Sequence, residues 1–163
     1  MRKELYEAIK ASVSSLRADA TGAFYMLPDD MDSDLDIDKN VFKHIDLWNQ
    51  NVEFIEQDAP WERPALFIEF CPIRWNTIVP GVQYAAEPQI RFHIVSDWVE
   101  DTEMDSLALR LPDALHLSIA GLSGMSFRDF TLAESHTNHN HEDIIESIEV
   151  YSFAAFMNIK QND

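Results

Sequence analysis

The segment Ile144–Phe156 limits the possible folds more than any other, because it carries large apolar side chains at successive positions. Side chains of an extended chain point alternately to the two faces of a sheet. The apolar residues therefore divide into two sets: Ile144, Ile148 and Val150 on one face, and Ile145, Tyr151 and Phe153 on the other. Since both faces need cover, we expect a strand at the centre of a sheet, or one whose outer face meets a partner.

The remaining patterns predict two helices and several shorter strands. Apolar residues recur at helical spacing over residues 4–18 and 104–119, and Pro112 is expected to kink or split the second helix. The ranges expected to form strands are 23–27, 42–48, 65–70, 83–95 and 125–136.

Two of these strands are expected to form a long antiparallel hairpin around residues 64–95, with a long tip at residues 73–82. Pro80-Gly81 is a strong turn signal inside that tip. Pro88 has no N–H for a strand ladder, so the second strand is expected at a sheet edge or with a bulge. The sequence thus predicts an α+β fold, with a mainly antiparallel sheet of four to five strands and two helices packed against it.

The chain of 163 residues is expected to form a single domain, residues 1–163, with an ample core, because 46% of its residues are hydrophobic. Its formal net charge is nevertheless −17, from 29 acidic residues against 12 lysines and arginines. Such a surface repels phosphates and anionic lipids, so we expect no direct sequence-specific binding of nucleic acid and no membrane partner. The charge could confer solubility, line a conduit for DNA or imitate DNA.

Six aspartates fall within residues 29–38. A calcium loop of the EF-hand type needs Gly at its sixth position and Glu at its twelfth, and the registers that start at Asp30, Asp32 and Asp34 all lack both. We therefore expect residues 28–40 to form a flexible acidic loop. The polar residues 158–163 are expected to form a frayed tail.

Cys71 is the only cysteine, so no intramolecular disulfide can form, and a reducing cytoplasm is the expected compartment. It ends an apolar run and is expected to be buried or at a sheet edge. No apolar stretch approaches the ~20 residues that a membrane-spanning helix needs.

Three histidines, His136, His139 and His141, lie within residues 136–143 beside two carboxylates. This composition is typical of zinc or nickel ligands. In an extended strand His136 faces away from the other two, so the three converge only if the segment curls. The intervening Asn and Thr residues favour a polar hairpin turn, which is our expectation. A metal-binding module or metal-dependent enzyme built on this segment is the alternative.

Other catalytic signatures are missing from the sequence. It has only four glycines and no phosphate-binding glycine loop. Ser123 lies in a helix stop and not in a Gly-x-Ser-x-Gly elbow. His44 and His93 are expected at surface or satisfied polar positions of strands. We therefore expect no catalytic residue, no bound cofactor and no enzymatic activity.

The tip of the predicted hairpin is the candidate interface, and its residues are Trp75, Asn76, Ile78 and Val79. Core or rim packing is the default expectation for the four tryptophans. Large aromatic side chains are also frequent anchors of protein interfaces, and Trp75 is the tryptophan that we most expect to reach a partner. We further expect residues 73–83 to extend to a neighbouring copy or to another protein.

Four segments carry a resemblance to a known family: Asp46–Gln50, Arg63–Phe70, Ile90–Val95 and His136–His141. In this order they resemble small structural proteins of tailed bacteriophages and prophages, in the neighbourhood of the tail terminator, or tail completion, proteins. The resemblance covers roughly residues 40–156 and consists of packing patterns.

The resemblance implies an α+β protomer that assembles into a ring and caps the tail tube at the head–tail joint. Its implied partners are further copies of itself and other tail or head–tail connector proteins. Its implied location is the bacterial cytoplasm during assembly and then the virion tail, and it implies no catalytic residues. A second alternative from the acidic composition is a DNA-mimic inhibitor.

Overall fold

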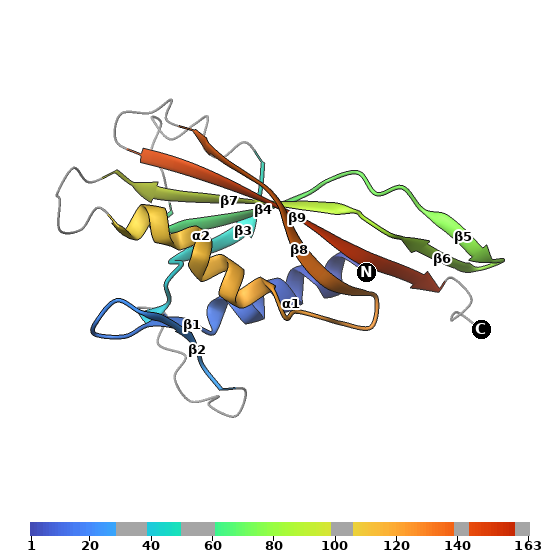
Figure 1. The fold of residues 1–163 in the computed structure, drawn as a ribbon, viewed down its shortest axis with the longest axis horizontal. Helices are drawn as coiled ribbons and strands as arrows, with labels where there is room; N and C mark the ends of the chain where they lie inside the picture. Colours follow the sequence, from blue (N-terminus) through green and yellow to red (C-terminus); the bar gives the residue numbers. More distant parts are fainter. Residues whose placement is uncertain (29–38, 50–60, 99–105, 139–143, 159–163) are drawn as a thin grey trace.

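The computed structural model describes residues 1–28, 39–49, 61–98, 106–138 and 144–158. These residues form two helices, a two-stranded sheet and a seven-stranded sheet (Figure 1). The elements are α1 (Arg2–Ser14), β1 (Leu16–Ala18), β2 (Phe24–Met26), β3 (His44–Leu47), β4 (Ala65–Phe70), β5 (Asn76–Val79), β6 (Val82–Ala85), β7 (Gln89–Asp97), α2 (Ser106–Ile119), β8 (Phe127–Asn138) and β9 (Ile144–Asn158). The predicted α+β class is confirmed, whereas the prediction of four to five strands is too low.

β9 is the central strand of the large sheet. One edge pairs antiparallel with β7 over residues 144–152 and with β6 over residues 155–158. The other edge pairs antiparallel with β8. From β7 the sheet continues through β4 to β3, which is parallel to β4, and from β6 it continues to β5. The central position predicted for this segment is confirmed.

The strands that the sequence does not predict occur where a proline interrupts the alternation of apolar residues, or where a strand is too short to show that alternation. The sequence predicts one strand over residues 83–95, but β6 and β7 occupy this range, with residues 86–88 between them. Pro88 cannot donate to a ladder, and its carbonyl instead accepts a hydrogen bond of 3.1 Å from the backbone N–H of Phe153. β1 and β5 are too short to leave a clear alternation in the sequence.

β4 and β7 pair antiparallel, as predicted for residues 64–95, with Leu66 opposite Ile94. The segment between them is not a simple tip. It forms a second hairpin, β5–β6, which adds to the sheet beside β9. Its turn is Pro80-Gly81, and Gly81 has a φ of 86°, a left-handed conformation that glycine adopts without steric cost.

The predicted position of Trp75 at the hairpin tip is wrong. Trp75 precedes β5, at the end of that strand away from the turn, and packs half-buried against the main core. Burial of the large indole surface stabilises this arrangement. The exposed apolar residues next to the turn are Ile78 and Val79.

Both helices pack on one face of the large sheet. Their buried residues are Leu5, Ile9 and Val13 of α1 and Leu111, Ala114, Leu115 and Ile119 of α2. The sheet residues in the same core are Leu66, Ile68, Ile90, Phe92, Ile94, Phe127, Phe130, Tyr151, Phe153 and Ala155. Removal of this apolar surface from water is the main stabilising contribution to the fold.

α1 ends at Ser14, before the predicted end at residue 18. The next residues, Leu16–Ala18, form β1 and pair antiparallel with β2. Asp19 stabilises the connecting turn, because its Oδ1 accepts hydrogen bonds from two backbone N–H groups of that turn. Leu16 still enters the main core, which explains why apolar spacing continues beyond the helix.

The sequence predicts that Pro112 kinks or splits the second helix, and α2 runs through this residue as one helix, so the split does not occur. Proline removes one hydrogen bond inside a helix. The buried residues Leu111 and Leu115, on both sides of it, hold the two halves against the sheet and offset this loss. α2 has 14 residues, and neither of the described helices has the length and apolarity to cross a membrane.

The acidic segment 29–38 and residues 159–163 lie outside the described residues, and with them most of the predicted loop and tail. Asn158, the first residue of the predicted tail, is instead the last residue of β9 and pairs with Val82.

Candidate functional site

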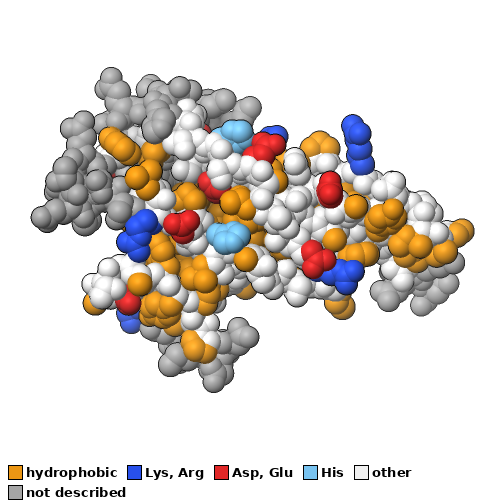
Figure 2. All heavy atoms as spheres, viewed as in Figure 1, with side chains coloured by type: hydrophobic (Ala, Val, Ile, Leu, Met, Phe, Trp, Pro, Cys, Tyr) orange, Lys and Arg blue, Asp and Glu red, His pale blue; other side chains and the backbone are white. Residues whose placement is uncertain are grey.

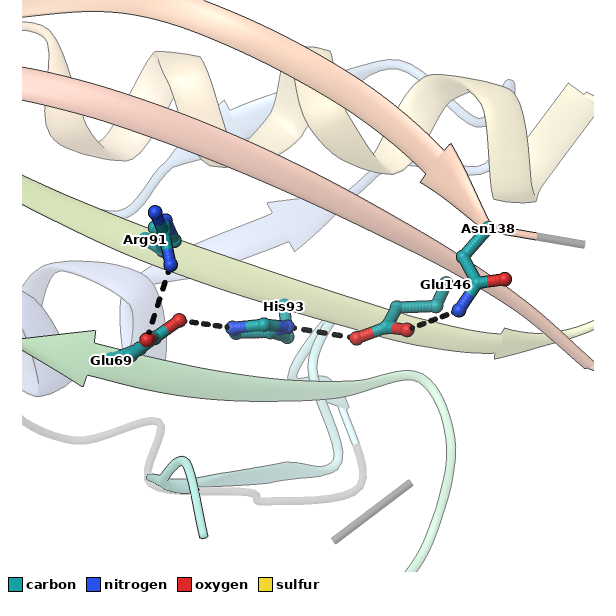
Figure 3. Close-up of polar contacts among 5 residues, drawn as sticks. All are labelled: Glu69, Arg91, His93, Asn138 and Glu146. Atoms are coloured by element: carbon teal, nitrogen blue, oxygen red, sulfur yellow. Dashed lines mark hydrogen bonds and ion pairs between the residues drawn. The ribbon is translucent and has the colours of Figure 1, made fainter. Parts of the chain in front are cut away.

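His93 lies near the middle of β7, on the sheet face opposite the helices, and is buried. Its Nδ1 lies 2.8 Å from Oε1 of Glu146 in β9, and its Nε2 lies 2.9 Å from Oε2 of Glu69 in β4 (Figure 3). The directly opposite residues are Phe67 and Ile148, so both glutamates reach the ring diagonally across the sheet. We call these three residues the histidine network, and it joins three adjacent strands.

Three further side chains surround the histidine network. A guanidinium N–H of Arg91 donates to Oε1 of Glu69 over 3.3 Å, and Nδ2 of Asn138 donates to Oε2 of Glu146 over 3.1 Å. Trp48 stacks on the imidazole, with ring centroids 3.8 Å apart and an angle of 1° between the planes. Each carboxylate therefore has two partners, and an indole covers one face of the imidazole.

The donor and acceptor roles in the network depend on the tautomer of His93. Each ring nitrogen lies within hydrogen-bond distance of a carboxylate oxygen. A neutral imidazole has one N–H and donates to one of the two glutamates, whereas an imidazolium donates to both. In either form, this one side chain links β7 to both neighbouring strands.

This arrangement fits a structural role better than a catalytic one. Both ring nitrogens of His93 lie against carboxylate oxygens and the ring is buried, so neither nitrogen is open to a substrate. Across the described ranges, no three His, Cys, Asp or Glu side chains gather in a way that could hold a metal. The contacts instead fix the register of β4, β7 and β9 and satisfy charges that would be costly to bury alone.

Aromatic rings cover the neighbouring part of the same face. Phe67 lies at the centre of this group and is fully buried. Trp61 meets it edge-on with ring centroids 5.1 Å apart, and Trp48 does so with centroids 6.1 Å apart. The rings form a smaller second core beside the histidine network.

A second buried polar group lies where β9 faces α2. Burial raises the pKa of Glu149; a hydrogen bond from Ser135 lowers it in part, and the Asp113 carboxylate raises it further. Burial also raises the pKa of Tyr151, whose hydroxyl lies 3.2 Å from Nδ1 of His116. Folding thus shifts the protonation equilibrium of Glu149 toward the carboxylic acid relative to the unfolded chain.

The histidines predicted as alternative metal ligands are only partly placed. His136 is exposed in β8, with Nε2 3.0 Å from Oε2 of Glu134. His139 and His141 lie outside the described residues. His136 lies in β8, as the strand predicted over residues 125–136 implies, and β8 continues through Asn138 into the segment predicted to form a turn.

The predicted interface residues of the hairpin are exposed, apart from Trp75. Asn76 is exposed, and Ile78 and Val79 have exposed fractions of 57% and 51%. The whole hairpin, Asn76–Ala85, contains no charged residue. Figure 2 shows apolar side chains gathered at the end of the molecule where β5 and β6 lie. We call Ile78 and Val79 the hairpin surface.

Two open clefts of about 380 Å³ lie beside the hairpin. The residues that line the first include Cys71, Arg74, Asn76 and Arg91. The residues that line the second include Met1, Val82, Met125 and Phe156. Burial raises the pKa of the Cys71 thiol, so this cysteine is a poor nucleophile. The second cleft has a mixed lining, with three methionines beside the polar residues Glu4, Ser126 and Asn158.

Sequence reasoning places His93 at a satisfied polar position but does not find its partners. One signal was available: Glu69 interrupts the apolar run of β4. A carboxylate in such a strand needs a hydrogen-bond donor from a neighbouring strand. Which strand would supply that donor follows only from the sheet order.

No protein-family model matches the chain, and no match is found among curated proteins.

His93→Ala is expected to lower the free energy of unfolding by about 3 kcal/mol, because it leaves Glu69 and Glu146 without their shared partner. Urea unfolding followed by circular dichroism measures the change. His136→Ala, at an exposed histidine, is the control and should change stability by no more than about 0.5 kcal/mol. Equal effects of the two substitutions would contradict the structural role of the network.

Glu149→Gln is expected to flatten the pH dependence of stability above the ordinary glutamate range. The raised pKa means that the folded state binds more protons than the unfolded state as the pH rises through this window. Stability therefore falls from the ordinary glutamate pKa up to the raised one, and the neutral amide removes this loss. Thermal unfolding at several pH values tests this; a parallel profile for both proteins would contradict it.

Proposed function

We propose that this chain is a non-enzymatic structural protein of a phage or prophage tail. Copies of it assemble into a ring at the head–tail joint, in the manner of the tail terminator proteins that its sequence resembles. The supporting features are its charge, the absence of a free catalytic group in the histidine network and the exposed hairpin.

The uncharged hairpin is the observation that carries the proposal. Solvent-exposed edge strands are usually protected by charged residues or prolines. β5 is the last strand at its edge of the described sheet, and all four of its residues are exposed. It carries neither charge nor proline, in a chain whose net charge is −17. Such an edge is suited to contact with another protein chain.

The acidic composition suits a ring through which DNA passes. A lumen with basic residues would bind the phosphate backbone and retain DNA, whereas an acidic lumen lets it slide. A closed ring also requires that each protomer present two different complementary surfaces. An apolar hairpin on an otherwise acidic molecule supplies one of these surfaces.

The mass of the native protein in solution tests the proposal. We expect a discrete oligomer larger than the 18.8 kDa monomer by light scattering, and a larger oligomeric fraction at 300 mM than at 20 mM NaCl. Higher salt screens repulsion between acidic copies, because the Debye length falls to about 6 Å at 300 mM. Assembly should strengthen by about tenfold over this range.

A monomer at all protein concentrations and both salt concentrations would contradict self-assembly. Metal content measured on the same sample distinguishes the alternative based on residues 136–143. One equivalent of zinc, lost when His136, His139 and His141 are replaced by alanine, would favour a metal-binding protein instead.

A further inference from the structure

The outer side of α2 carries the exposed apolar residues Leu109 and Leu117. Their exposed fractions are 65% and 46%, and a spacing of eight residues places both on the same broad side of a helix. We call them the helix surface. In water such leucines are costly unless a partner covers them.

Charge distinguishes the helix surface and the hairpin surface from the rest of this acidic chain. The hairpin Asn76–Ala85 has no charged residue. α2 has a single carboxylate, the exposed Asp113, which lies midway between the two leucines on the same side of the helix, and a single arginine, Arg110, which contacts the Gly22 carbonyl. Two copies that each carry a net charge of −17 repel one another, and the repulsion is weakest where one surface is uncharged and the other has only one carboxylate. These two surfaces can therefore meet without bringing carboxylates together.

The hairpin surface and the helix surface lie far apart within one copy. Figure 1 shows the β5–β6 hairpin at one end of the long axis, while α2 begins near the other end. Any contact between the hairpin surface and the helix surface would therefore join two different copies. A contact between two different surfaces is heterologous, and it builds a ring when the rotation from copy to copy closes.

We propose that Ile78 and Val79 of one copy pack against Leu109 and Leu117 on α2 of the next copy. This inference rests on the proposed function, because it names the contact that joins neighbouring protomers. When an apolar strand edge packs against a helix, each element covers the exposed apolar side chains of the other. Met125, which is 94% exposed and lines the cleft next to β6, adds to the apolar area on the hairpin side.

Two double variants test the contact. Ile78→Asp with Val79→Asp disables the hairpin surface, and Leu109→Asp with Leu117→Asp disables the helix surface. Each variant alone should have the mass of a monomer, because every junction lacks one of its surfaces. An equimolar mixture should give dimers of twice 18.8 kDa and no larger species, since only one junction has both surfaces intact.

Thr131→Asp with Leu132→Asp is the matched control, since it adds the same charge on exposed positions of β8. It should assemble like the unmodified protein, and circular dichroism should show that all three variants are folded. Assembly of the helix variant to the full oligomer would overturn this inference and leave the proposed ring intact. Dimers formed by the helix variant alone would indicate a symmetric hairpin contact and would also overturn it. A monomeric unmodified protein would overturn both.

Discussion

The large sheet depends on β9, because this strand of 15 residues pairs with β6, β7 and β8. Along one edge it joins the body of the sheet to the projecting hairpin, since residues 144–152 pair with β7 and residues 155–158 with β6. Its two faces have different chemistry. Tyr151 and Phe153 meet the helices in the main core, while Glu146 lies on the opposite face as part of the histidine network. A register shift of one residue would exchange these faces, so the two environments together specify one register.

The histidine network adds specificity where hydrophobic packing alone would allow alternatives. Apolar residues tolerate small shifts between strands, but His93 meets two carboxylates only when β4, β7 and β9 are aligned as observed. Buried polar groups often add little net stability, yet they are costly when a partner is lost. This rigid centre supports the β5–β6 hairpin, which has an exposed first strand and pairs with β9 through its second. A stiff core and an exposed apolar edge are together suited to a protein that acts by assembly.

Periodicity in the sequence predicts the central strand, both helices and the antiparallel pairing of β4 with β7, because these depend on apolar residues at regular spacing. It does not predict the break at Pro88 or β1, where a short strand continues the apolar spacing of a helix. The exposure of Ile78 and Val79 is predicted by the turn signal beside them. The packing of Trp75 against the core agrees with the default expectation for tryptophans, but its place away from the hairpin turn does not follow from the sequence, since it depends on which elements lie nearby in space. The network around His93 is missed for the same reason, because its partners come from strands distant in the sequence.

The central claim is that this chain acts by head-to-tail assembly through its hairpin. Electron microscopy of the purified protein at moderate salt tests it most directly, because averaged images reveal the symmetry and density maps reveal the contacts. The account predicts closed rings with a central opening, in which each β5–β6 hairpin reaches α2 of the neighbouring copy. Particles with only two-fold symmetry, or rings in which the hairpin contacts no neighbour, would contradict it.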